Sequence, residues 1–556
     1  MNKYILAIIF ILGNSLHIWF LKINDILKIP DSFAYLQMAH YFKNTSIGGF
    51  GNGWFGFLYS MPIALVGKIA ENDILSAFIV NMALFNLFVL ACYLIGKNYL
   101  KSEYNALFLI LIFLSPILLN YNINILSENI YLPLFLILFI GILRYRDIPD
   151  FSGSIFLGLM LALLYFTRAE AFIYLGSIGL IILYLLLSGK ITFGKAFFNY
   201  LTVIISFFIF ISPYLFHLHS ITGERGLTNK GSANLRQAEL RGVSKMDDDG
   251  FEQAVGELTS DNHHLIAGFA GGLKYDKPEE SQSFKYYLLN NPQKIIERIK
   301  ENQIKLYTNN LPNLIIGNAF SLYKIEGNQI FYQNKLFLIL LIIPFLLIFY
   351  SLIILIKNGD GYFVFSFASL FTVASLFFTL FFVLDRYFLV FLPIFIFLIV
   401  YSIEKLGTEI SEFLENTKYI LFSILFIGIY SLGTFSYYNT FKNEDTKYQV
   451  KKIAGEWIKQ NDFRTNLKIM ERFPVVTYYA GARERWLTPY TQKLSSLAEY
   501  ARFNEINYLV VDSIDFKKYR PNLIFLLNNS NIKLPGFEKI KEFENAGEKV
   551  ILYRIK

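Results

Sequence analysis

Long apolar runs alternate with short polar segments through the first 440 residues of the chain. A helix needs about 20 apolar residues to cross the roughly 30 Å hydrocarbon core of a bilayer. Runs close to that length lie near 4–21, 75–96, 104–120, 128–143, 153–167, 171–188, 198–217, 336–356, 362–383, 387–403 and 418–438. The pattern predicts a polytopic α-helical membrane protein with about 11 transmembrane helices.

The basic residues of the short connections set the direction of these spans, because Lys and Arg collect in cytoplasmic loops. If the N-terminus is cytoplasmic, every short inner loop is basic. The inner loops then carry Lys97, Lys101, Arg144, Arg146, Lys190, Lys195, Lys357, Lys405 and Lys418. The outer side receives the long loops 22–74 and 218–335 and the C-terminal segment. No small-x-small cleavage motif follows the first run, which predicts an uncleaved first span in the plasma (inner) membrane.

The segments outside the membrane carry their own patterns. Within the first outer loop, 31–42 reads as an amphipathic helix, and 292–311 in the second reads as a helix along the membrane surface. After about residue 446, helical patterns at 450–460, 494–503 and 522–528 alternate with strand patterns at 467–470, 508–512 and 549–555. The sequence predicts a transmembrane domain over 1–439 and a soluble extracytoplasmic α/β domain over 440–556.

The amino-acid composition excludes several classes of function. Charged residues make up 17% of the chain, below the roughly 25% of soluble domains. The net charge of +8 comes with basic loops between apolar runs, not with a basic stripe interleaved with exposed aromatics, so nucleic acid is excluded as a partner. The single Cys92 excludes an intramolecular disulfide and a cysteine metal cluster.

Five ionisable residues near the spans are the main candidates for chemistry, because charge at membrane depth is costly. On the predicted topology all of them lie at outer ends of spans or in the first outer loop: Asp31, Glu128, Arg168, Glu170 and Arg386. This shared face predicts a single site on the outer side of the membrane.

Each candidate also has a structural interpretation. Asp31 after Pro30 is suited to cap a helix, or to act as a general base for an attacking hydroxyl. Glu128 is either an interfacial carboxylate in water or a ligand-positioning group. Arg168 and Glu170 are either a cap between two spans or part of the site.

Arg386 has the same two interpretations. It either pairs with Asp385 and snorkels to the interface, or binds a phosphate through its guanidinium.

Four other motifs give little indication of a functional site. The run Asp247–Gly250 lacks the ligand spacing of a calcium loop, and adjacent His263 and His264 cannot share one helical face. Gly268–Gly272 lacks the strand–turn–helix setting of a phosphate loop. In the C-terminal segment, Asp512 and Arg520 are predicted to be surface residues.

Together these features resemble the GT-C superfamily of membrane glycosyltransferases, in the branch of protein mannosyltransferases and aminoarabinose transferases. The resemblance covers essentially the whole chain. It rests on Pro30–Tyr35 with Ala39, Ser127-Glu128, Thr167–Glu170, and Arg386-Tyr387 with Pro393. Ser32 stands where the family often has a second acidic residue. The Trp-Trp-Asp signature of the oligosaccharyltransferase branch is absent.

The resemblance implies inverting transfer of a sugar from a polyprenyl- or dolichyl-phosphate donor to an extracytoplasmic acceptor, which is a glycan, a lipid or a protein. Asp31 would be the base and Arg386 or Arg168 the phosphate partner. Glu128, Glu170 and Tyr387 would bind substrate. No cofactor is assigned, and the family leaves open a divalent cation, since some members use one and others rely on basic residues.

A membrane transporter or a polysaccharide-export protein without catalysis is the alternative. Transporters usually show internal repeats and charges near the membrane midplane, and neither feature is evident in this sequence.

Overall fold

The structure is a computed structural model of the 556-residue chain. It describes residues 3–23, 30–44, 55–222, 227, 292–316, 323–326, 329–332, 335–381, 383–411, 428, 448–482, 484–486, 488, 494–520, 523–528, 535–545 and 547–556. These residues fall into two compact units. The first is built from Met1–Ile26, Ile69–Pro213 and Gln293–Asn443, and the second from Leu27–Lys68, Tyr214–Pro292 and Glu444–Lys556.

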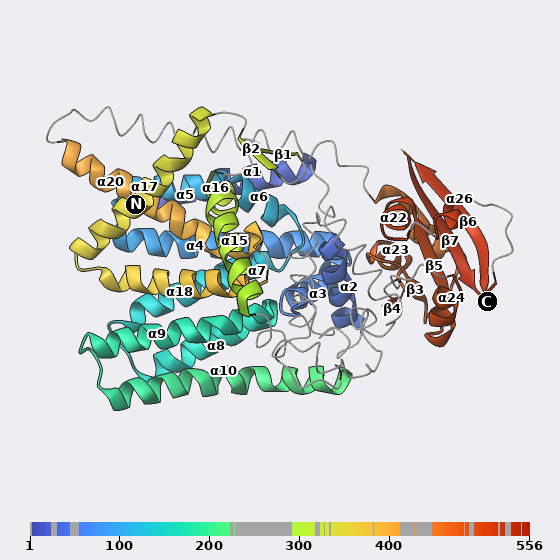
Figure 1. Ribbon diagram of the computed structural model, residues 1–556, viewed down its shortest axis with the longest axis horizontal. Helices are drawn as coiled ribbons and strands as arrows, with labels where there is room; N and C mark the ends of the chain where they lie inside the picture. The colour runs from blue at the N-terminus through green and yellow to red at the C-terminus, as the bar shows by residue number, and fades with distance from the viewer. Residues whose placement is uncertain are drawn as a thin grey trace. The chain divides into compact units, whose positions relative to one another are not determined.

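The first unit is helical (Figure 1). In chain order its helices are α1 (Lys3–Ile23), α4 (Asp73–Tyr99), α5 (Ser102–Leu114), α6 (Pro116–Ile123), α7 (Glu128–Tyr145), α8 (Phe151–Thr167), η2 (Ala169–Ile173), α9 (Tyr174–Leu187), α10 (Phe193–Thr222, which continues into the second unit), α15 (Pro292–Lys305), η5 (Leu306–Asn310), α16 (Leu311–Ile316), α17 (Lys335–Lys357), α18 (Gly361–Thr379), α19 (Asp385–Phe388), η6 (Leu389–Phe391) and α20 (Leu392–Ser411). A short antiparallel hairpin, β1 (Tyr323–Glu326) with β2 (Gln329–Tyr332), lies within the loop predicted over 218–335.

Six helices in the described ranges are long and apolar enough to cross a membrane, or up to seven if the bent pair α5 and α6 forms one span. That pair is bent by 54° at Ser115. Shorter apolar helices lie at Tyr4–Trp19, Ser60–Ala70, Phe151–Thr167 and Ile342–Lys357. The multi-span helical architecture is therefore present. The run at 418–438 lies almost entirely outside the described residues, and the full count of about 11 spans stays a prediction.

Small and polar side chains hold the helices together, as expected where no water is available to drive packing. At Gly158, α8 approaches α10 so closely that an added Cβ would lie 2.7 Å from the carbonyl oxygen of Val203. The Asn81 amide of α4 donates to the carbonyl oxygens of Asn122 (2.8 Å) and Asn124 (3.0 Å). These bonds fasten the chain just before α7, the helix on which Glu128 lies.

The second unit contains a five-stranded mixed sheet with the order β4-β3-β5-β7-β6. Its strands are β3 (Lys468–Met470), β4 (Glu484–Trp486), β5 (Tyr508–Asp512), β6 (Phe537–Asn545) and β7 (Glu548–Ile555). β4, β3 and β5 are parallel, whereas β7 is antiparallel to both β5 and β6. The strands predicted at 467–470, 508–512 and 549–555 correspond to β3, β5 and β7, while β4 and β6 were not predicted.

Helices cover both faces of this sheet (Figure 1). Alternate residues of β5 point to opposite faces, which is the period-2 rule of a strand. Leu509 and Val511 pack with α24 (Leu494–Phe503) and α26 (Phe525–Asn528). Tyr508 and Val510 pack with α22 (Gln449–Asn461) and α23 (Val475–Ala480). The predicted domain boundary at 440 lies outside the described residues.

The same unit includes α2 (Pro30–Asn44) and α3 (Ser60–Ala70), of which Ile69 and Ala70 belong to the first unit. The helix predicted at 31–42 is α2. Its buried side chains include Phe33, Tyr35 and Leu36, and the Ser60 hydroxyl of α3 donates to the Tyr35 carbonyl oxygen at 3.0 Å.

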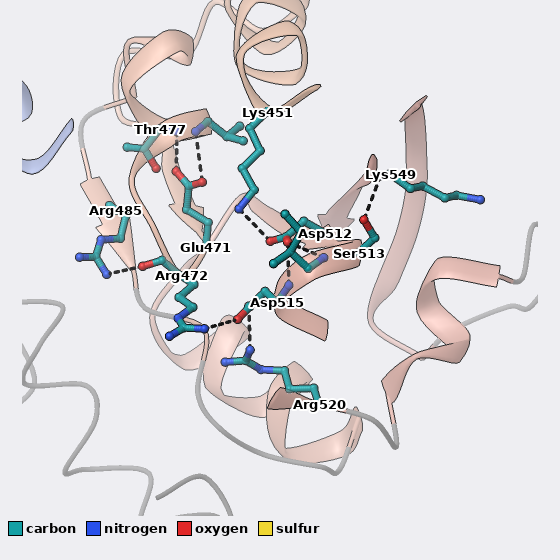
Figure 2. A network of polar contacts seen from close by, with 12 residues as sticks. Lys451, Glu471, Arg472, Thr477, Arg485, Asp512, Ser513, Asp515, Arg520 and Lys549 are labelled. Carbon is teal, nitrogen blue, oxygen red and sulfur yellow. Dashed lines mark hydrogen bonds and ion pairs between the residues drawn. The ribbon is translucent and has the colours of Figure 1, made fainter. Parts of the chain in front are cut away.

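The prediction that Asp512 and Arg520 are surface residues is wrong, because their side chains are only 4% and 0% exposed. Both belong to a buried polar network (Figure 2). Asp512 pairs with Lys451 of α22 at 3.0 Å, and Arg520 pairs with Asp515 of α25 (Ser513–Tyr519) at 2.7 Å. A buried charge needs a partner. Asp515 lies in the helix that Arg520 ends, but Lys451 is 61 residues before Asp512, so that pairing could not be read from local sequence.

Asp462 immediately follows α22, and its hydrogen bonds lead us to expect that the stability of the fold depends on pH. Its carboxylate accepts hydrogen bonds from Arg464 (2.9 Å) and the Tyr508 hydroxyl (2.8 Å). The hydrogen bond from Arg464 lowers the pKa of Asp462 from 3.8 to about 2. A depressed carboxyl pKa stabilises the fold above the unfolded pKa, and this contribution is lost as the pH falls through the folded pKa.

We therefore expect Asp462→Asn to lower the melting temperature of the purified chain at pH 6, and to lower it less at pH 3. Thermal unfolding of both proteins at the two pH values measures this difference. A deficit that stays the same at both pH values would contradict the assignment.

Candidate functional site

Glu128, Arg168 and Glu170 meet in one buried cluster of the first unit. The Arg168 guanidinium lies 2.7 Å from the Glu128 carboxylate and 3.6 Å from that of Glu170. The three side chains are 11% (Arg168), 4% (Glu128) and 15% (Glu170) exposed. Two carboxylates therefore share one cation away from bulk water.

The backbone explains how Arg168 reaches both partners. α8 ends at Thr167, and Arg168 is extended, with φ −150° and ψ 116°. The next five residues form the 3-10 helix η2 before α9 begins at Tyr174. The two spans predicted to meet at Arg168 are thus separate helices, and the break turns the guanidinium toward Glu128 in the first turn of α7.

Two tyrosine rings flank the guanidinium. The Arg168 Cζ lies 5.3 Å from the ring centroid of Tyr387 and 5.8 Å from that of Tyr131. The Tyr387 ring in turn stacks on Phe378, with centroids 4.4 Å apart and planes within 7°. Cation–π contacts of this kind stabilise a cation away from water, so Arg168 is held in place on several sides.

Arg386 lies beside the same cluster. Its guanidinium carbon is 5.8 Å from the Tyr387 ring centroid. The neighbouring Asp385 accepts a hydrogen bond from Asn310, at the end of the π-helical turn η5. Such turns inside helices are frequent at functional sites.

Sequence reasoning missed several members of this cluster. Tyr131 and Tyr174, which are both buried, lie three residues after Glu128 and four after Glu170. The i,i+3 spacing puts Tyr131 on the same face of α7 as Glu128, and it is the signal that would have found Tyr131. Tyr174 had no such signal, because Glu170 lies in the 3-10 helix η2 and Tyr174 begins α9. Asn310 had no such signal.

The structure separates the alternatives for two candidates. Glu128 is not an interfacial carboxylate in water, because its side chain is 4% exposed and paired. Arg168 does pair with Glu170 across the break, but it also reaches Glu128, so it is more than a local cap.

Asp31 belongs to the second unit, whereas Glu128, Arg168, Glu170, Arg386 and Tyr387 belong to the first. It lies in the first turn of α2, which begins at Pro30, so it sits inside the helix and not at the cap position. Its side chain is partly exposed. The neighbouring Ser32 is buried, and its hydroxyl has no hydrogen-bond partner among the residues that the structure describes. A second carboxylate at this position would be a buried charge.

No metal-binding cluster is found among the residues that the structure describes. No group of three His, Cys, Asp or Glu side chains in these ranges has the arrangement of a metal site. The two carboxylates closest to one, Glu128 and Glu170, are bridged by Arg168, whose positive charge would repel a second cation. Asp247–Gly250, His263, His264 and Gly268–Gly272 lie outside the described residues.

No protein-family model and no curated protein matches the chain. Solved structures do. ArnT from Cupriavidus metallidurans bound to undecaprenyl phosphate aligns with a TM-score of 0.56 and 9% identity, over 99% of this chain and 98% of that one.

The archaeal oligosaccharyltransferase AglB from Archaeoglobus fulgidus, in complex with an inhibitory peptide and a dolichol-phosphate, aligns with a TM-score of 0.52 and 11% identity. This alignment covers 99% of the chain and 74% of that one. The same archaeal enzyme in complex with Zn and sulfate gives a TM-score of 0.56 at 10% identity, over 98% of this chain and 72% of that one. Both neighbours are GT-C enzymes, and the chain has the fold of the GT-C membrane glycosyltransferases.

Proposed function

We propose that this protein is a glycosyltransferase that moves a sugar from a polyprenyl- or dolichyl-phosphate to an extracytoplasmic acceptor, with inversion at the anomeric carbon. The observation that carries the proposal is the buried Glu128–Arg168–Glu170 cluster, at the ends of helices, in a chain with the GT-C fold. Solved neighbours bound to undecaprenyl phosphate and to a dolichol-phosphate support this donor class.

The proposed topology keeps the N-terminus in the cytoplasm. Residues 1–439 form the catalytic domain in the plasma (inner) membrane, and 440–556 form an extracytoplasmic domain. Loop charges support this direction, because the inner connections such as those at Arg144 and Lys190 are basic.

The reaction makes two demands on the protein. The acceptor oxygen forms a bond to the anomeric carbon while the bond from that carbon to the phosphate oxygen breaks. The acceptor gives up a proton, and negative charge grows on the departing lipid phosphate. A base and a cation are required, and we assign Asp31 as the base and Arg386 as the phosphate partner.

The charges around Arg168 support choosing Arg386 over Arg168 for the phosphate. Arg168 already neutralises one of the two carboxylates that it contacts, which leaves the Glu128–Arg168–Glu170 cluster with one net negative charge. A phosphate would be repelled by this cluster. Carboxylate oxygens are good acceptors for hydroxyl groups, so the cluster suits the sugar, with Tyr387 between the two arginines.

A donor-cleavage assay tests the proposal. The purified chain is mixed with a radiolabelled lipid-linked sugar and candidate acceptors, and release of free polyprenyl phosphate is followed. Mass analysis of lipid that co-purifies with the chain identifies the donor. We expect acceptor-dependent release. Movement of an intact lipid-linked sugar across a vesicle membrane, with no cleavage, would favour the transporter alternative instead.

Arg386 provides a sharper prediction. Arg386→Gln keeps most of the side-chain volume and removes the charge, so kcat/KM for the donor should fall roughly 10- to 100-fold, as expected for losing about 1.5–3 kcal/mol of a charge-assisted hydrogen bond. Arg144→Gln is the matched control, because Arg144 is exposed at the end of α7. Equal kcat/KM values for both variants would remove Arg386 from the site.

A further inference from the structure

Phe33 ties the helix that carries Asp31 to the C-terminal part of the second unit. It lies two residues after Asp31 in α2, and its side chain is 1% exposed. Its ring meets three tyrosine rings edge-to-face, at centroid distances of 6.3 Å (Tyr448), 5.9 Å (Tyr478) and 5.9 Å (Tyr479). We call these three tyrosines the aromatic clamp. Edge-to-face pairs at such distances are attractive and directional.

Close packing of α22 on α23 sets the position of the clamp. Tyr448 immediately precedes α22, and Tyr478 and Tyr479 lie in α23. At Gly455 of α22, an added Cβ would lie 2.6 Å from the Tyr479 Cβ and 2.8 Å from the Val476 carbonyl oxygen. Both are atoms that cannot swing away, so any larger residue at 455 would push the two helices apart.

Buried charges brace the same helices. The Glu471 carboxylate is buried and accepts hydrogen bonds from the backbone N–H groups of Val476 (3.1 Å) and Thr477 (2.6 Å), immediately before Tyr478. Lys451 of α22 reaches from the other side to Asp512. Figure 2 shows the Glu471 carboxylate directed at the backbone beside Thr477 and the Lys451 ammonium directed at Asp512. The helices that carry the aromatic clamp are therefore held by buried polar contacts that do not involve α2.

Tyr448 carries a further sign of constraint. Its φ is 78°, in the left-handed region, and a non-glycine residue there costs about 1–2 kcal/mol. Such conformations persist where the surroundings over-determine them, and they gather at functional sites. Here the ring contacts Phe33 and lies 5.8 Å from the Lys451 ammonium, which is itself held by Asp512.

We propose that the C-terminal domain positions the catalytic base: the aromatic clamp holds Phe33, and through it the first turn of α2, so that Asp31 keeps one orientation. This inference rests on the proposed function, which makes Asp31 the base. Phe33 and the clamp are positioning residues. Loosening them lets the turn move and lowers turnover without weakening donor binding, because misplacement by about 1 Å can cost roughly 100-fold in rate.

The test uses the full chain and the donor-cleavage assay. Phe33→Leu removes the ring contacts, and Gly455→Ala disturbs the clamp from behind without touching α2. We expect each to lower kcat roughly 10- to 100-fold, with the KM for the lipid-linked donor unchanged. Gly194→Ala in α10 is the matched control, because nothing lies within 4 Å of its added Cβ. Gel filtration and thermal unfolding verify that each variant folds, and Phe33→Met replaces Phe33→Leu if that variant does not.

A double variant separates positioning from general damage. If the clamp acts through Asp31, Phe33→Leu adds no further loss to the residual rate of Asp31→Asn, so the two effects are not additive. Equal loss in both backgrounds would mean that the clamp is only structural, and would overturn the inference. Wild-type kcat in Phe33→Leu and Gly455→Ala, with Asp31→Asn inactive, would overturn it while leaving the proposed function intact. Full activity of Asp31→Asn would instead rule out Asp31 as the base, and absence of donor cleavage by the unaltered chain would defeat the proposed function itself.

Discussion

Asp31→Asn is expected to lower sugar transfer at least about 100-fold while the lipid-linked donor still binds, since general-base catalysis typically contributes 10²–10⁴-fold. Asparagine has nearly the shape of aspartate but cannot accept the proton of the acceptor hydroxyl. The effect should therefore appear in kcat and not in donor affinity. Release of free polyprenyl phosphate measures kcat, and binding of labelled donor measures affinity.

The fold should survive this substitution. Asp31 lies in the first turn of α2, where its negative charge interacts favourably with the helix dipole, a contribution of about 0.3–1 kcal/mol. Asp147→Asn is the control for removal of one carboxylate, because Asp147 is 65% exposed in the connection between α7 and α8. Full transfer by Asp31→Asn, or an equal loss in Asp147→Asn, would rule out Asp31 as the base.

Arg168→Met is expected to destabilise the protein by about 3–5 kcal/mol and to abolish transfer, since removing one partner of a buried ion pair leaves uncompensated charge. Methionine fills much of the same space. It leaves the Glu128 and Glu170 carboxylates, which are 4% and 15% exposed, without the cation that they share. Thermal unfolding of the purified chain in detergent measures the loss.

The double variant Glu128→Gln with Arg168→Met tests the cause of this loss. Neutralising the more deeply buried carboxylate should restore part of the stability but none of the activity, because the damage to the fold comes from unpaired charge. If Arg168→Met alone unfolds at the wild-type temperature, the cluster does not stabilise the fold in the way that its geometry indicates.

Much of this architecture could be predicted from sequence, because it depends on local patterns. Apolar runs of helical length indicated the spans, and the isolated Arg168 marked the break between α8 and α9. The short apolar run Tyr508–Asp512 indicated a buried strand, which is β5. Charges are rare in the spans, so the few that remained were recognisable as candidates before any contact was known.

Which side chains pair with one another, in contrast, was decided by the tertiary structure. Glu128 and Arg168 are 40 residues apart, and Asn310 and Asp385 are 75 apart, so no helical or strand period relates them. Asp512 and Arg520 were mistaken for surface residues because a charge in the sequence does not reveal the buried partner that stabilises it. The contact of Phe33 with Tyr478 likewise joins segments from the two ends of the chain. Sequence alone determined which residues are costly to bury, and only packing determined what stabilises each of them.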